Sequence, residues 1–201
     1  MFSQLRPALT LILIFTLLTG LALPLGFVGL GAAVFPNQAG GSLIVRDGVV
    51  RGSALIGQDF TDPRYFHPRP SATTIADPND ATKTLPSPYA ADASNGSNLA
   101  PTSATLVARV AASLAAWTHD GGPSPVPADA LTTSASGLDP DISPANAQGQ
   151  RARVAAARGL TDAAVRALVD AHTTRPLLGF IGEPHVNVLR LNLALDASAA
   201  P

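Results

Sequence analysis

The sequence predicts a single N-terminal transmembrane helix followed by a mixed α/β (α+β) domain outside the cytoplasm. Two observations carry this prediction. No charged residue occurs between Arg6 and Arg46, and residues 9–34 are almost wholly apolar. Beyond them, loops rich in Gly and Pro separate short segments whose apolar residues follow helical or strand periodicity. We therefore expect a membrane anchor at residues 8–34 and an extracytoplasmic domain over residues 35–201.

The apolar segment is long enough to cross a bilayer, because about 20 helical residues span a hydrocarbon core of roughly 30 Å. A cleaved signal peptide has a shorter apolar region, of about 7–15 residues, so we expect a retained anchor. Arg6 is the positive charge at its N-terminal end, and the positive-inside rule places residues 1–7 in the cytoplasm. Pro24 predicts a kink in this helix. Thr16 and Gly20 form a small-xxx-small pair that would let a partner helix approach closely.

The exported part begins with a predicted β-hairpin. Ser42–Arg51 contains two β-branched runs around Asp47 and Gly48, a dipeptide that favours a type I′ turn. Residues 58–98 then show no sustained period and are rich in Pro, Asp, Asn, Ser and Gly. Periodicity alone leaves open whether this long stretch is ordered or irregular.

Three helices are predicted in the second half of the chain. The first covers Pro101–Trp117, and its spacing places four apolar residues on one face. These residues are Leu106, Val110, Leu114 and Trp117. The second helix runs from an N-cap at Ser143 to a C′ residue at Gly159. The third covers Asp162–His172 and follows an N-cap at Thr161.

Two strands are predicted outside these helices. Val126–Ala135 is expected to form a short helical turn and then a strand rich in Thr and Ser. At the end of the chain, leucines alternate with other residues through Val186–Leu195. This alternation predicts a half-buried strand.

Composition excludes several functional classes. The chain has 13 basic and 14 acidic residues and a net charge of −1, without the clustered basic excess that nucleic-acid binding needs. It has no cysteine, which excludes disulfides, thiolate nucleophiles and iron–sulfur clusters. Its 4 histidines are not spaced as metal ligands, and the sequence has no Walker A, Rossmann, G-x-S-x-G or H-E-x-x-H motif. We therefore expect no catalytic residue, no metal and no directly bound cofactor.

The polar stretch Tyr89–Ser103 is a candidate contact surface. Tyr89 would supply a large aromatic contact, and Asn95 and Asn98 would supply hydrogen bonds beside it. The alternative is a simple turn before the following helix, with Tyr89 packed inside the domain.

Five blocks of sequence occur in an order that is typical of one family. They are LIGQDF (55–60), YFHPRPSAT (65–73), YAADASNGSNLAPTS (89–103), SGLDPDISPANAQGQRARVAAARGL (136–160) and LLGFIGEPHVNVLRLNLALD (177–196). Together with the single N-terminal span, these blocks resemble the KdpC family, the C subunit of Kdp-type potassium-transporting P-type ATPases.

The resemblance implies an accessory, non-hydrolysing subunit held in the cytoplasmic membrane by one helix. Its partners would be the lipid bilayer, a channel-like potassium-translocating subunit and an ATP-hydrolysing P-type subunit, so that the complex handles ATP and K⁺. The family also implies a catalytic chaperone role that increases ATP binding by the hydrolysing subunit. Because a domain outside the membrane cannot meet cytoplasmic ATP, we expect that effect to be indirect coupling.

Two other functional classes stay open. A membrane-tethered exported hydrolase would use a serine with Glu183 or a histidine, and would need a third group that orients them. A periplasmic small-ligand-binding module would need a closed apolar pocket of roughly several hundred Å³.

Overall fold

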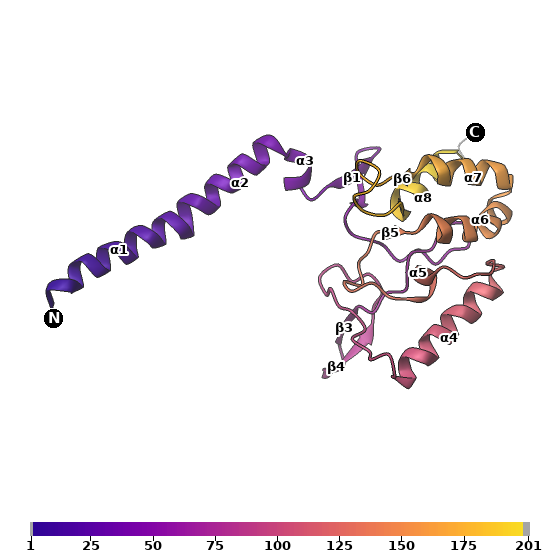
Figure 1. Ribbon diagram of the computed structural model, residues 1–201, viewed down its shortest axis with the longest axis horizontal. Helices are drawn as coiled ribbons and strands as arrows, with labels where there is room; N and C mark the ends of the chain where they lie inside the picture. Colours follow the sequence, from indigo (N-terminus) through magenta and orange to yellow (C-terminus); the bar gives the residue numbers. More distant parts are fainter. Residues whose placement is uncertain (1, 199–201) are drawn as a thin grey trace. The chain divides into compact units, whose positions relative to one another are not determined.

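One long helix occupies most of the first of two compact units, which cover Met1–Arg51 and Gly52–Pro201 (Figure 1). The computed structural model describes residues 2–198. The uninterrupted helical segment Leu5–Val34 is long and apolar enough to cross a membrane. The helical elements of this unit are η1 (Phe2–Gln4), α1 (Leu5–Leu17), η2 (Leu18–Ala22), α2 (Leu23–Val34) and α3 (Pro36–Ala39).

A π turn, η2, lies just before Pro24, close to where a kink is predicted. Proline has no N–H to donate, and its ring clashes with the carbonyl group one turn earlier in a regular α-helix. In this turn the Leu23 N–H donates to the Leu18 carbonyl five residues earlier, and the Thr19 hydroxyl donates to the Phe15 carbonyl at 2.6 Å. The helix therefore continues through Pro24 by widening one turn.

The predicted hairpin is confirmed. Strands β1 (Leu43–Arg46) and β2 (Val49–Ser53) form a two-stranded sheet. The turn residues Asp47 and Gly48 both have positive φ, 54° and 72°, as a type I′ turn requires.

A second hairpin, β3 (Thr74–Asp77) and β4 (Asp80–Pro86), lies within the stretch whose order the sequence left open. Its strands are antiparallel, with Thr74 opposite Pro86. The Asp77 carboxylate accepts a hydrogen bond from the Asn79 N–H at 2.8 Å, which fixes the turn. Part of residues 58–98 is thus regular structure.

The hydrophobic core of the second unit lies among three helices and a small antiparallel sheet of strand order β5-β7-β6 (Figure 1). These elements are β5 (Asp141–Ile142), α6 (Pro144–Arg158), α7 (Asp162–Ala171), β6 (Thr173–Thr174), β7 (His185–Asn187) and α8 (Val188–Ser198). The buried apolar cluster consists of Phe66, Ile142, Ala147, Val154, Ala155, Val165, Val169, Val186, Val188, Leu191 and Leu195.

The three predicted helices are confirmed, and each begins at a side-chain cap. The Ser143 hydroxyl accepts the Asn146 N–H at 3.1 Å, and Gly159 ends α6 in the left-handed conformation. Thr161 caps α7 in the same way. Ser103 caps α4 (Ala104–His119), which has no buried residue, so its apolar face is only partly covered.

The predicted strand Val186–Leu195 is wrong. Only its first residues belong to β7, and α8 begins at Val188. The residues of α8 that are buried follow helical spacing, and they are Val188, Leu189, Leu191, Asn192 and Leu195. The Asn187 side chain accepts the Arg190 N–H at 3.1 Å, so an N-cap starts the helix where leucine alternation had indicated a strand.

In the segment Val126–Ala135, the predicted helical turn is confirmed and the predicted strand is wrong. It contains the short helix α5 (Ala128–Leu131), but the described residues after it do not form the expected strand. The hydroxyls of Ser134 and Ser136 accept the main-chain N–H groups of Gly137 and Leu138 instead. Serine turns of this kind compete with strand pairing.

Candidate functional site

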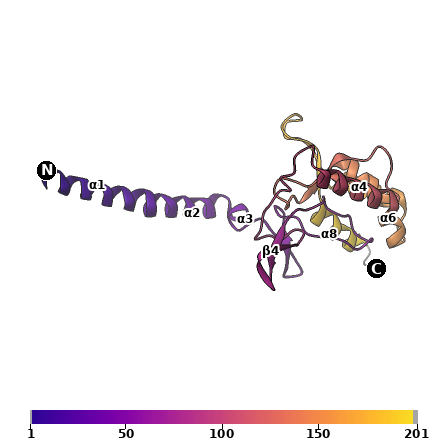
Figure 2. The same ribbon diagram turned by 90° about the horizontal axis from the view of Figure 1, so that it is seen from below.

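The loop between β6 and β7 exposes four large apolar side chains within five residues. In Figure 2 it is the orange-to-yellow segment that projects from the helices of the second unit. The exposed fractions are 68% for Leu177, 76% for Leu178, 76% for Phe180 and 50% for Ile181. Apolar residues gathered in this way mark an interaction surface more often than scattered ones do. We call these four residues the apolar loop.

Backbone hydrogen bonds hold the apolar loop in one shape. The N–H of Leu177 donates to the Ile181 carbonyl at 3.0 Å, and the reverse bond is 2.9 Å long. Leu178 and Gly179, between them, have positive φ of 55° and 82°. The loop is therefore a turn closed by its own main-chain hydrogen bonds, and its four apolar side chains are exposed.

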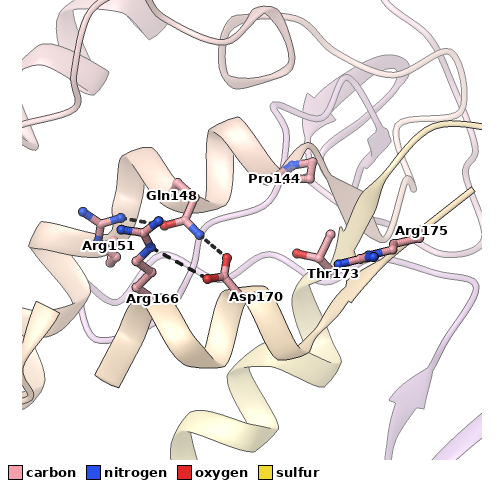
Figure 3. A pocket seen from close by; sticks show the side chains of 7 residues that line it. All are labelled: Pro144, Gln148, Arg151, Arg166, Asp170, Thr173 and Arg175. Carbon is pink, nitrogen blue, oxygen red and sulfur yellow. Dashed lines mark hydrogen bonds and ion pairs between the residues drawn. The ribbon is translucent and has the colours of Figure 1, made fainter. Parts of the chain in front are cut away.

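A shallow groove of about 650 Å³ lies beside this loop, between α6 and α7 (Figure 3). Gln148 joins the two helices, since its amide donates to Asp170 at 2.9 Å and its carbonyl oxygen accepts from Arg151 at 2.6 Å. Arg166 lies 3.8 Å from the same Asp170 carboxylate. In the described part of the chain, Arg175 has no assigned partner, and it precedes the apolar loop by two residues. The side chains that line the groove thus hold α6 against α7, and Arg175 lies at its end without a partner among residues 2–198.

In the polar stretch, Tyr89 is partly buried, whereas Asn95 and Asn98 are exposed. The Tyr89 hydroxyl donates to the Arg69 carbonyl at 2.9 Å, and a Cβ at Gly57 would lie 2.4 Å from its ring. Burial raises the pKa of Tyr89 above its ordinary value. The Asn95 side chain is exposed, and its main-chain N–H donates to the Ser136 carbonyl at 2.9 Å. Asn98, also exposed, has a φ of 49°.

The predicted small-residue pair lies around the π turn of the long helix. Thr16 lies in the last turn of α1 and Gly20 lies within η2, and both are exposed. A Cβ at Gly20 would meet nothing within 4 Å among the described residues. Packing within the chain therefore does not explain this glycine.

A cleft of about 470 Å³ lies between α4 and α6. Its walls are partly apolar, including Trp117, and partly cationic, with Arg69, Arg109 and Arg153. These mixed walls differ from the closed apolar pocket that a small-ligand-binding module would be expected to have.

The four histidines bond to main-chain carbonyls and to one aspartate. Their ring nitrogens lie within hydrogen-bond distance of Asp62 O (His67), Asp120 Oδ1 (His119), Leu168 O (His172) and Glu183 O (His185). Burial lowers the pKa of His67. Among residues 2–198, no group of three or more histidine, aspartate or glutamate side chains is arranged to hold a metal.

The sequence matches the family described as K⁺-transporting ATPase, c chain, over residues 5–197. The chain belongs to the KdpC family. Three KdpC relatives carry the description "Potassium-transporting ATPase KdpC subunit". They come from Rhodopseudomonas palustris (56% identical over 198 residues, 98% of this chain and 100% of the relative), Bradyrhizobium diazoefficiens (54% over 200 residues, 100% of both) and Methylobacterium nodulans (56% over 199 residues, 99% of both).

Membership of the KdpC family confirms the resemblance drawn from the five sequence blocks. Sequence reasoning nevertheless missed the apolar loop as a candidate surface, although the last block begins with it. The available signal was the run Leu177–Ile181, which lies between Pro176 and Gly182 and is too short for a core helix. A run this short in a loop does not form a helix or strand with one face turned toward the core, so its side chains are expected to be exposed.

Proposed function

We propose that this chain is an accessory, non-hydrolysing subunit of an ATP-driven potassium import complex and that it docks to its partners through the apolar loop. The exposure of Leu177, Leu178, Phe180 and Ile181 is the observation that carries this proposal. Burial of a large apolar side chain contributes roughly 1.5–3 kcal/mol. Four such side chains can therefore supply a large part of a stable contact with an apolar partner surface.

The apolar loop is suited to docking because its shape does not depend on those side chains. The main-chain bonds between Leu177 and Ile181 hold the turn before any partner binds. A preformed loop loses little conformational freedom on binding. Arg175 beside it adds a cation that could pair with a carboxylate at the rim of the contact.

Replacing Leu177 and Phe180 together by serine is expected to lower co-purification of the partner subunits by at least about tenfold, because most of the apolar contact is lost. The loop should keep its shape, since its hydrogen bonds are made by the backbone. Pull-down of the tagged chain in mild detergent, with the melting temperature in parallel, measures both effects.

A matched control replaces Leu55 and Val107 by serine. Both side chains are also highly exposed, at 64% and 63%, but lie elsewhere on the unit. This control should keep wild-type co-purification. Full recovery of partners with the loop variant, at unchanged melting temperature, would rule out the apolar loop as the docking surface.

Further contacts are proposed in the membrane and along the polar stretch. Thr16 and Gly20 would let a helix of the channel-like potassium-translocating subunit pack closely within the bilayer. Asn95 and Asn98 are exposed and can donate and accept hydrogen bonds at a contact. Tyr89 is the aromatic candidate of the same stretch, although its ring is half-buried.

The catalytic chaperone role is part of this proposal as an indirect effect. The unit that contains the apolar loop would lie outside the cytoplasm, where it cannot touch ATP. We infer that it raises ATP binding by the ATP-hydrolysing subunit through the conformation of the partners it holds. Such coupling acts by binding one state of the complex more tightly than another.

Protease added to intact spheroplasts is expected to digest the chain beyond about residue 36. The reason is that Arg6 is the only charge flanking the N-terminal end of the long helix, which keeps that end in the cytoplasm. Immunoblotting against a C-terminal tag measures the loss. Protection in spheroplasts with digestion in inverted vesicles would establish the opposite orientation.

A further inference from the structure

Arg109 on α4 is a cation that the cleft leaves without a partner. Its Nε is buried and, in the described part of the chain, has no hydrogen-bond acceptor. Within the described residues, its guanidinium takes part in no assigned ion pair. A buried donor of a charged group that lacks an acceptor is costly. A guest in the cleft can offer an acceptor to the terminal N–H groups of Arg109, which lines it.

The two other arginines of the cleft already have partners within the protein. Arg69 donates to the Asp139 carboxylate at 2.8 Å, although its Nε is also buried without an acceptor. Arg153 donates to the carbonyls of Pro63 and Tyr65 at 2.7 and 3.0 Å, and burial lowers its pKa. Among the described residues, Arg109 is thus the arginine of this cleft that has no ion pair with the protein.

Two aspartates limit the charge of that guest. Asp59 and Asp120 also line the cleft, and Asp120 lies 3.7 Å from the Arg153 guanidinium. Asp139 neutralises Arg69 and Asp120 lies beside Arg153, so Arg109 is the lining arginine that the described structure leaves without a carboxylate partner. A polyanion would be repelled by both carboxylates, whereas one negative charge would be balanced.

Part of the remaining lining is apolar, and contacts within the protein hold it in place. Phe60, Pro68 and Trp117 line the cleft, and the Trp117 indole donates to the Pro123 carbonyl at 3.0 Å. A Cβ at Gly149 would lie 2.5 Å from the Trp117 ring, so α4 and α6 meet at this glycine. The cleft volume of about 470 Å³ falls within the range of sites for small molecules.

We propose that this cleft binds a small monocarboxylate with an apolar body. The carboxylate would accept hydrogen bonds from the terminal N–H groups of Arg109, and the apolar part would lie against Phe60 and Trp117. Guanidinium groups pair well with carboxylates because their N–H donors form a planar fork. This site is separate from the apolar loop and does not rest on the docking role.

Trp117 is the only tryptophan of the chain, so its fluorescence reports on the cleft directly. Titration of the full-length protein in mild detergent with hexanoate is expected to change the emission in a saturable way. Hexanamide has a similar shape without the charge and should give no saturable change at the same concentrations. ATP, a polyanion, should bind more weakly than hexanoate.

Arg109→Gln is expected to weaken hexanoate binding by at least about tenfold, because a charge-assisted contact is lost. Arg109→Lys, which keeps the charge, should retain a saturable response and serves if the glutamine variant does not fold. Arg166→Gln, at an exposed position outside the cleft, should bind as the wild type does. An equal response to hexanamide, tighter binding of ATP, or unchanged binding by a folded Arg109→Gln variant would overturn the proposal.

Discussion

Asn192→Ala is expected to destabilise the second unit by about 3–5 kcal/mol, because it leaves two buried main-chain groups without partners. Asn192 is 1% exposed. Its side-chain oxygen accepts the Phe66 N–H at 2.8 Å, and its amide donates to the Phe66 carbonyl at 3.0 Å. Alanine can replace neither bond, and water has no access to this part of the core.

The melting temperature of the full-length protein measures this loss, with Trp117 emission as the signal. For a unit of this size, we expect a fall of at least about 6 °C. Asn79→Ala is the matched control, because Asn79 lies exposed in the turn between β3 and β4. A melting temperature for Asn192→Ala within error of that control would mean that the Phe66 main chain finds other partners.

Gln150 on α6 makes the same kind of contact one residue further along. Its oxygen accepts the His67 N–H at 2.7 Å, and its amide donates to the His67 carbonyl at 3.0 Å. Two amide side chains therefore hold the irregular segment around Phe66 against α6 and α8, much as a neighbouring strand would. This segment also forms one wall of the cleft, so the core and the cleft share one support.

Local signals predicted the elements that depend on a few neighbouring residues. The caps at Ser143 and Thr161 and the turn at Asp47 and Gly48 lie where the sequence indicates, because each is decided by its own side chain or φ angle. The last helix was missed because leucine alternation outweighed a single cap residue, Asn187. Helical burial and strand alternation share several positions in so short a segment.

The support of the core could not be predicted, since it depends on contacts between distant residues. Asn192 and Phe66 are 126 positions apart, and Gln150 and His67 are 83 apart. The candidate surfaces could not be predicted for the same reason. The sequence shows the apolar residues of the loop and the charge of Arg109. Only the fold decides that the loop residues are exposed and that Arg109 has no partner among residues 2–198.

Tyr89→Ala is expected to destabilise the second unit by about 3 kcal/mol or more, because both the ring and the hydroxyl contact the unit itself. The ring lies against Gly57 and the hydroxyl donates to the Arg69 carbonyl. Tyr89 also has a φ of 59°, which is unfavourable for an aromatic residue and is kept only where packing holds it. Tyr89→Phe, which loses only the hydroxyl, should cost about 1 kcal/mol.

Melting temperatures and co-purification of these variants separate an internal role of Tyr89 from a contact with a partner. A fall in co-purification by Tyr89→Ala together with a large fall in melting temperature would reflect the loss of internal packing. Asn95→Ala provides the matched test of the polar stretch, because its exposed side chain can be removed at little cost in stability. If Tyr89→Ala keeps the wild-type melting temperature but loses the partners, the ring belongs to the interface and the internal role is wrong. If it melts early while Asn95→Ala melts normally and loses the partners, the contact is made by the exposed asparagines on a loop that Tyr89 holds in place.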